Sequence, residues 1–235
     1  MSKFVTIKAI NTLQLTHWYQ PIIQLNTDAI LGYEALVRSK THHNFSPLDL
    51  FKQAESKGIM NYLDCHLLNK AANSRKNKKP YMLFINVFPS TLLEEWFLSW
   101  WDEHITNSKL VLEVSESEPV SDWRALKNVV HELRMRGVKI ALDDMGTGYC
   151  FFQHWIELNP EYIKLDSYYE HDLAKNELKQ RILKHLIKLF DDNTKLILEG
   201  IETEEDLNVA KSLGITCAQG YLLGKPSPLE TASEI

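Results

Sequence analysis

Cysteine is scarce in this sequence of 235 residues. The three cysteines, Cys65, Cys150 and Cys217, are odd in number and far apart. A disulfide framework or a Cys-x-x-Cys metal site needs closely and regularly spaced cysteines, so neither is expected. We therefore expect reduced thiols and a cytoplasmic protein.

Long apolar runs and basic tracts are missing as well. No window approaches the roughly 18 uncharged apolar residues of a transmembrane helix, and residues 1–16 lack the pattern of a signal peptide. We therefore expect no membrane partner. The chain has 26 Lys and Arg against 31 Asp and Glu, a net charge of −5, which argues against a nucleic-acid polymer as partner. A small phosphate ligand remains compatible, particularly if a metal ion lies between the phosphate and the acids.

Nothing in the composition divides the chain. Hydrophobic residues make up 44% and charged residues 24%, as in an ordinary globular protein. The length allows one large domain or two small ones, but no linker rich in proline or glycine separates two halves. We expect one domain.

Short apolar runs alternate with segments of helical spacing. Only residues 26–28 join the first two runs, whereas a parallel crossover needs about a dozen, so these two predict an antiparallel hairpin. The later runs predict a parallel sheet covered by helices. We expect an α/β fold, a closed (β/α)8 barrel with an antiparallel first strand. The predicted strands are Trp18–Leu25, Ala29–Val37, Met82–Val87, Leu110–Val114, Val138–Leu142, Tyr162–Leu165, Lys195–Leu198 and Thr216–Ala218.

Acidic residues recur at the ends of these predicted strands. A single acid there is more often a helix cap or a solvated loop residue, but repetition at corresponding points is hard to attribute to capping. In a barrel these ends converge on one face. Oxygen ligands favour Mg²⁺ or Mn²⁺ over zinc, and two adjacent acids are suited to hold two ions. The six acids are Glu34, Glu113, Asp143, Asp144, Asp166 and Glu199, and the amide Asn86 stands at the corresponding point of another strand.

Lys164 is unusual because it lies inside an apolar run. One interpretation is a buried ion pair with Asp166 or Asp144. The other is that Lys164 orients an attacking water in a phosphate site. The glycines in the segment Met145–Tyr149 are weak evidence alone, but after two candidate ligands they suggest a mobile active-site loop.

Eight ordered motifs span nearly the whole chain. They are Tyr19-Gln20-Pro21-Ile22, Glu34-Ala35-Leu36 with Val37-Arg38, Phe84-Ile85-Asn86-Val87, Glu113-Val114-Ser115-Glu116, the segment Asp143–Tyr149, Ile163-Lys164-Leu165-Asp166, Glu199-Gly200-Ile201-Glu202-Thr203, and Gln219-Gly220-Tyr221 with Gly224-Lys225-Pro226. Together they resemble the EAL domain family of cyclic di-GMP phosphodiesterases. The resemblance implies one domain over residues 1–235 with a TIM-like barrel at 17–226, a lead-in at 1–16 and a tail at 227–235.

The resemblance also implies site residues and a reaction. One divalent ion is expected on Glu34, Asn86, Glu113 and Asp143, and a second on Asp143, Asp144 and Glu199. Lys164 would orient the nucleophilic water, Glu199 would assist its deprotonation, and Glu116 would brace the 143–149 loop. The implied reaction is hydrolysis of cyclic di-GMP to linear pGpG with Mg²⁺ or Mn²⁺, whereas Ca²⁺ is expected to inhibit. The implied substrate-binding residues are Gln20, Leu36, Arg38, Asp166, Glu202 and Gln219.

Some positions depart from the family pattern. Met145 stands where the family usually has Phe, Cys150 and Phe151 replace small hydroxyl residues, and the usual Trp after Arg38 is missing. The main alternative function is a catalytically weak or silent EAL module that binds cyclic di-GMP or a protein partner. The resemblance further suggests a homodimer and an external regulatory protein as partners.

An aromatic cluster follows the third predicted strand. Its members are Trp96, Phe97, Trp100 and Trp101. Their helical spacing favours packing on the barrel over an exposed partner surface.

Overall fold

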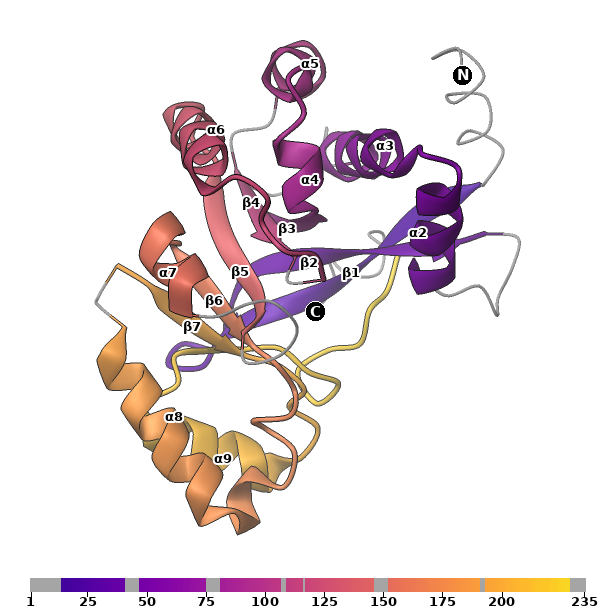
Figure 1. Ribbon diagram of the computed structural model, residues 1–235. Helices are drawn as coiled ribbons and strands as arrows, with labels where there is room; N and C mark the ends of the chain where they lie inside the picture. The colour runs from indigo at the N-terminus through magenta and orange to yellow at the C-terminus, as the bar shows by residue number, and fades with distance from the viewer. Residues whose placement is uncertain are drawn as a thin grey trace.

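The fold is a closed barrel of eight strands (Figure 1). The structure is a computed structural model that describes residues 14–40, 47–74, 81–106, 109–115, 117–145, 152–190 and 193–228. The strands follow one another around the barrel in chain order. They are β1 (Leu15–Gln24), β2 (Ala29–Ser39), β3 (Met82–Val87), β4 (Leu110–Val114), β5 (Lys139–Met145), β6 (Tyr162–Leu165), β7 (Lys195–Leu198) and β8 (Cys217–Ala218).

The first strand runs against the others, as the short connection at residues 26–28 predicts. β1 pairs antiparallel with β2 on one side and with β8 on the other, whereas the pairs from β2 to β8 are parallel. The expected barrel with an antiparallel first strand is therefore confirmed, and four of the eight predicted strands have the observed bounds. β1 begins at Leu15, and Ser227 pairs with Tyr19. The division into lead-in, barrel and tail remains a prediction.

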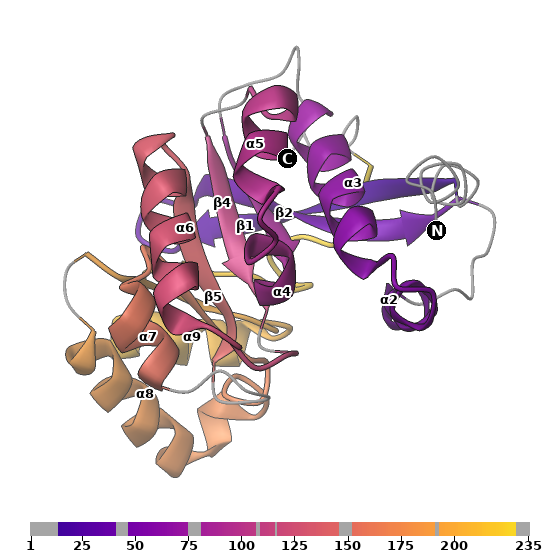
Figure 2. The same cartoon turned by 45° about the horizontal axis from the view of Figure 1, so that its top comes forward.

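The helices surround the barrel (Figures 1 and 2). None of the described helices is both long and apolar enough to cross a lipid bilayer. A short 3-10 helix, η1 (Leu173–Lys175), precedes α8. The α-helices are α2 (Pro47–Ser56), α3 (Met60–Asn73), α4 (Pro89–Leu92), α5 (Phe97–His104), α6 (Trp123–Met135), α7 (Phe152–Leu158), α8 (Glu177–Leu189) and α9 (Glu204–Leu213).

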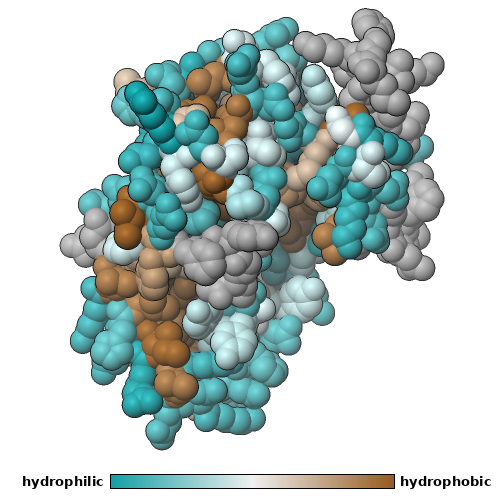
Figure 3. Space-filling view, in the orientation of Figure 1, coloured by the Kyte–Doolittle hydropathy of each residue, from teal (hydrophilic) through white to brown (hydrophobic). Residues whose placement is uncertain are grey.

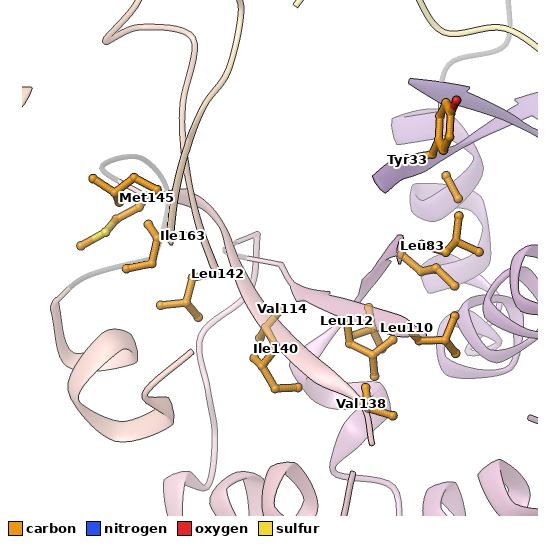
Figure 4. Close-up of a cluster of buried hydrophobic side chains, with 14 of the residues drawn as sticks. Tyr33, Leu83, Leu110, Leu112, Val114, Val138, Ile140, Leu142, Met145 and Ile163 are labelled. Carbon is orange, nitrogen blue, oxygen red and sulfur yellow. The ribbon is translucent and has the colours of Figure 1, made fainter. Parts of the chain in front are cut away.

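The main hydrophobic core lies between the strands and the helices. Alternate residues of β4 and β5, among them Leu112 and Ile140, point outward into this layer (Figure 4). The predicted packing of the aromatic cluster on the barrel is confirmed, because Phe97 and Trp101 are buried in this core and Trp96 and Trp100 pack against it. Cys65 and Cys217 are buried free thiols, whereas Cys150 lies outside the described residues.

A second, smaller core fills the inside of the barrel. Each strand contributes one side chain to it, and we call this layer the plug. Phe84 and Tyr162 are its largest members, and their rings meet edge to face with centroids 5.1 Å apart. A packed interior closes the barrel, so that a ligand can reach the inside only from an end. The plug consists of Ile22, Leu31, Phe84, Val111, Ala141, Tyr162, Ile197 and Cys217.

Candidate active site

A polar ring lies one layer above the plug, toward the carboxyl ends of the parallel strands. Because side chains on one face of a strand recur every two residues, the next inward residue after Phe84 is Asn86, and after Val111 it is Glu113. The same step applies to five other strands. In β2 the step is three residues, because the pairing with β1 is irregular between Ile22 and Ile23. The polar ring consists of Gln20, Glu34, Asn86, Glu113, Asp143, Lys164, Glu199 and Gln219.

Lys164 lies among four carboxylates of the polar ring. It is 1% exposed, and its Nζ lies 2.8 Å from Glu199 Oε1, 2.9 Å from Asp143 Oδ1, 3.1 Å from Glu113 Oε1 and 3.4 Å from Glu34 Oε2. Burial alone would lower the pKa of Lys164, but the surrounding carboxylates raise it well above its ordinary value. The ammonium is therefore held protonated at neutral pH.

Asp166 was one of the two acids expected to form an ion pair with Lys164, but its carboxylate contacts a backbone N–H group. Its Oδ1 accepts a hydrogen bond of 2.8 Å from the backbone N–H of Tyr168. The described ion pairs of Lys164 are instead with members of the polar ring. Neither interpretation of Lys164 anticipated this set of four acids.

Burial and crowding make two of the carboxylates poor acids. Burial raises the pKa of Glu113 well above its ordinary value, and Glu34, Asp143 and Glu199 raise it further, while Lys164 opposes them. Burial likewise raises the pKa of Glu199, against the opposing charge of Lys164. One ammonium is therefore too little positive charge for the acids gathered around it.

A backbone irregularity brings both acids of the Asp143-Asp144 pair to the same side. Successive residues of a regular strand point to opposite faces. Asp144, however, has φ +46°, and the pairing of β5 with β6 is irregular between Leu142 and Met145. One carboxylate oxygen each from Asp143, Asp144 and Glu199 consequently lie within 4.8 Å of one another. Such left-handed backbone in a non-glycine residue is a feature that functional sites retain.

Two amide side chains of the ring orient its acids. Asn86 Nδ2 donates to Glu34 Oε1 at 3.2 Å and to Glu113 Oε2 at 3.1 Å. Gln219 Nε2 donates to Glu34 Oε2 at 2.7 Å. Rotation of the Asn86 amide by half a turn would present its oxygen to the same space, as a metal ligand requires.

The donor set fits divalent cations that prefer oxygen. The site offers five carboxylates, including Asp144, against the single ammonium of Lys164. Glu113 Oε1 and Asp143 Oδ1 are buried without a hydrogen bond of good geometry among the described residues, although both lie within ion-pair distance of Lys164. Buried oxygens of this kind need positive charge nearby, and hard cations such as Mg²⁺ and Mn²⁺ supply it.

The predicted substrate-binding residues lie in the ring or near the mouth of the barrel. Gln20 and Gln219 are buried in the ring, and Gln20 Nε2 donates to the carbonyl of Gly224 at 3.1 Å. Leu36 and Arg38 are half-buried on β2. Glu202 is exposed after β7, so it lies outside the ring. Glu116 and residues 146–149 of the predicted loop lie outside the described residues, as do Cys150 and Phe151.

A cavity of about 220 Å³ lies beside Leu36 and Arg38 of β2, and it was not predicted from the sequence. Leu36, Arg38 and Asn86 line it together with Asp64 of α3. Asp64 Oδ2 accepts a hydrogen bond of 2.9 Å from the Phe88 backbone, and burial raises the pKa of Asp64 to about 7. Asp64 lies in the middle of helix α3. The one sequence signal for a role of Asp64 is a carboxylate on the apolar face of that helix.

A close approach of backbones fixes the two loops that carry Glu199 and Gln219. A Cβ at Gly220 would lie 2.1 Å from the carbonyl oxygen of Ile201. Only glycine allows this contact. The loops after β7 and β8 are also joined by backbone hydrogen bonds from Ile201 to Gln219 and from Leu222 to Ile201.

Comparisons with known proteins agree with this geometry. The EAL domain family model matches residues 7–226. A probable cyclic di-GMP phosphodiesterase, PdeI of Escherichia coli K12, is 34% identical over 89% of this chain and 28% of its own length. The cyclic di-GMP phosphodiesterase PA2567 of Pseudomonas aeruginosa is 32% identical over 93% of this chain and 40% of its own length.

Solved structures share the fold. The PaMucR phosphodiesterase in complex with c-di-GMP has a TM-score of 0.80 and 26% identity, covering 96% of this chain and 97% of that one. BlrP1 of Klebsiella pneumoniae with manganese and cy-diGMP has a TM-score of 0.81 and 25% identity, covering 91% of this chain and 56% of that one. The chain spans between 27% and 46% of the length of the first five curated relatives. Because the family model matches nearly the whole sequence, the chain belongs to the EAL domain family.

Proposed function

We propose that this chain is a metal-dependent phosphodiesterase that hydrolyses cyclic di-GMP to linear pGpG and so lowers the level of this second messenger. The observation that carries the proposal is the polar ring, in which four carboxylates surround one lysine at the mouth of the barrel. Relatives named as cyclic di-GMP phosphodiesterases support the substrate.

Two divalent ions, Mg²⁺ or Mn²⁺, would be held by the acids of the site. Glu34, Asn86, Glu113 and Asp143 would hold one ion, and Asp143, Asp144 and Glu199 the other. Bound divalent ions neutralise phosphate oxygens and lower the pKa of a coordinated water. The close approach of Asp143, Asp144 and Glu199 supports the second set.

Three residues of the chain have proposed roles in handling the water and in holding the active-site loop. Lys164 stays protonated, so it can hold and orient a water but cannot accept its proton. Glu199 contacts Lys164 at 2.8 Å, and burial raises its pKa, so its carboxylate is a stronger base than an exposed one and is proposed to assist deprotonation of the water. Glu116 is proposed to brace the loop that follows Asp143.

The substrate would lie across the mouth of the barrel. Gln20, Leu36, Arg38, Asp166, Glu202 and Gln219 are proposed to contact its guanines or phosphates. The cavity beside Leu36 and Arg38 is smaller than a pocket for a drug-sized ligand, which suits one base rather than a whole dinucleotide. Asp64 at its wall could accept hydrogen bonds from the N–H groups of a guanine edge.

The proposed function is tested by separating binding from turnover. The purified chain is incubated with cyclic di-GMP in Mg²⁺, Mn²⁺ or Ca²⁺, the nucleotides are separated by chromatography, and binding in Ca²⁺ is measured by calorimetry. We expect pGpG in Mg²⁺ or Mn²⁺, and binding without product in Ca²⁺. Binding in all three ions with product in none would assign an effector role instead, and absence of binding would refute both.

A homodimer is proposed as the assembly. The outer side of α8 exposes Leu178, Ile182 and Leu189 by 57%, 38% and 48%, and Figure 3 shows apolar side chains along this part of the surface. Two antiparallel copies of α8 would bring Leu178 of one copy near Leu189 of the other, and Glu177 near Lys188. Apolar side chains would then contact each other, and opposite charges would pair. Light scattering should give twice the chain mass, and Ile182→Asp should give the monomer. An external regulatory protein remains a prediction.

A further inference from the structure

Trp18 is a large aromatic side chain on the inner wall of the barrel mouth. Its neighbours in β1, His17 and Tyr19, are 7% and 3% exposed, and Tyr19 belongs to the core beneath the helices. The pleat of the strand therefore turns Trp18 to the opposite side, where it is 40% exposed. Gln20, the next residue on that side, belongs to the polar ring. Trp18 thus lies one layer above the ring.

The neighbouring strand, β2, carries two of the predicted substrate-binding residues beside Trp18. Leu36 of β2 is the register partner of Trp18. The guanidinium carbon of Arg38 lies 5.7 Å from the centroid of the Trp18 ring. A half-exposed indole, an aliphatic side chain and a cation therefore share one patch beside the site.

A role confined to the stability of the hairpin does not explain this placement. An exposed cation–π contact stabilises a fold only slightly, and burial of the indole against a helix would stabilise it much more. The outward side of the same strand is already buried, so an inward Trp is not needed to hold β1 on the barrel. Proteins that bind nucleotides use exposed aromatic rings and arginine in this way, because every base has a planar face.

We propose that Trp18 is a substrate-binding residue that stacks on one guanine base of the dinucleotide, with Arg38 beside it. This inference rests on the proposed function, because it takes cyclic di-GMP as the ligand of the same mouth. Stacking holds the base in both the bound substrate and the transition state. Removal of the Trp18 indole is therefore expected to raise KM and to leave kcat unchanged.

The experiment compares the wild type with Trp18→Ala and Trp18→Phe. For Trp18→Ala we expect the KM for cyclic di-GMP in Mn²⁺, and the Kd in Ca²⁺, to rise about tenfold, which is within the range measured for base stacking. We expect kcat to stay within about twofold and Trp18→Phe to recover most of the affinity. The fluorescence change on adding cyclic di-GMP in Ca²⁺ should shrink in Trp18→Ala, although five other tryptophans remain. Thermal unfolding of all three proteins serves as the control for folding.

The outcomes separate this inference from the proposed function. If the wild type binds and hydrolyses cyclic di-GMP while Trp18→Ala has an unchanged KM and Kd, the stacking role is refuted and the proposed function stands. A fall in kcat without a rise in KM, or no recovery in Trp18→Phe, would also refute stacking. If the wild type neither binds nor hydrolyses the dinucleotide, the proposed function fails, and the stacking role fails with it.

Discussion

The plug and the polar ring are neighbouring layers of the same barrel, and the step between them is two residues along most strands. The plug contains only apolar side chains, tyrosine and cysteine, packed without charge. The ring one step above it holds four carboxylates, three amides and a lysine, and most of these side chains are buried as deeply as the plug. One strand therefore supplies Phe84 to the first layer and Asn86 to the second.

The difference shows how the barrel separates stability from chemistry. Burying apolar side chains stabilises the fold, whereas burying like charges costs stability unless positive charge compensates them. Lys164 compensates part of the ring, but burial and the neighbouring acids still raise the pKa of Glu113 and Glu199. The plug stabilises the frame on which this unfavourable arrangement is held.

The largest effect is expected from a change in the ring. Glu34→Ala removes a carboxylate that contacts Lys164, Asn86 and Gln219. We expect the rate of pGpG formation to fall by at least about 1,000-fold, because interactions with a transferring phosphate dominate such barriers. The fold should be retained, as measured by circular dichroism.

A matched control is an acid far from the ring. Glu55 is exposed on α2, so Glu55→Ala should keep the wild-type rate. Substantial turnover by Glu34→Ala in Mg²⁺ or Mn²⁺ would contradict the role of the ring.

A change in the plug should lower the stability of the fold and leave the activity of the folded protein unchanged. Phe84 is fully buried, and Phe84→Ala should lower the free energy of unfolding by about 3 to 5 kcal/mol, measured by denaturant titration. The molecules that remain folded should still hydrolyse the substrate, because no polar group of the ring has changed. A folded Phe84→Ala protein without activity would show that the two layers are not separable.

The sequence predicted the frame better than the contacts inside it. Apolar runs and the short connection at residues 26–28 predicted all eight strands and the reversed one, since periodicity and chain length determine both. The acids were predicted to converge because the carboxyl ends of barrel strands share a face. Which acids surround Lys164 depends on register and strand tilt, and a list of strand ends contains neither.

Trp18 and Asp64 show a second limit of sequence reasoning. Trp18 was predicted as part of a strand, and only its pairing with β2 places it beside Leu36. Asp64 sits on a helix whose burial depends on how α3 packs over the barrel. Both assignments require tertiary contacts that no local pattern carries.

A smaller effect is expected from adding a divalent cation to the ring. Because its acids exceed its bases, Mn²⁺ should bind the folded protein and raise its thermal midpoint, corresponding to about 2.7 kcal/mol at 100 times the Kd. Differential scanning fluorimetry measures this without substrate. Glu34→Ala should need more Mn²⁺ for the same shift, whereas Glu55→Ala should behave like the wild type. Equal shifts in all three proteins would place the binding of Mn²⁺ outside the ring.

The pH dependence of stability is expected to reflect a buried acid that belongs to neither layer. Burial raises the pKa of Asp64 from 3.8 to about 7, so between these values the folded protein binds more protons than the unfolded chain. The stability contributed by the protonated form is therefore lost as pH rises, with a slope of up to about 1.4 kcal/mol per pH unit. Asp64→Asn should remove this slope, as measured by urea unfolding from pH 4 to 8, while Glu55→Ala should keep it. An unchanged slope in Asp64→Asn would mean that the loss of stability in this range comes from other acids, such as Glu170, whose pKa is also raised to about 7, mainly by burial.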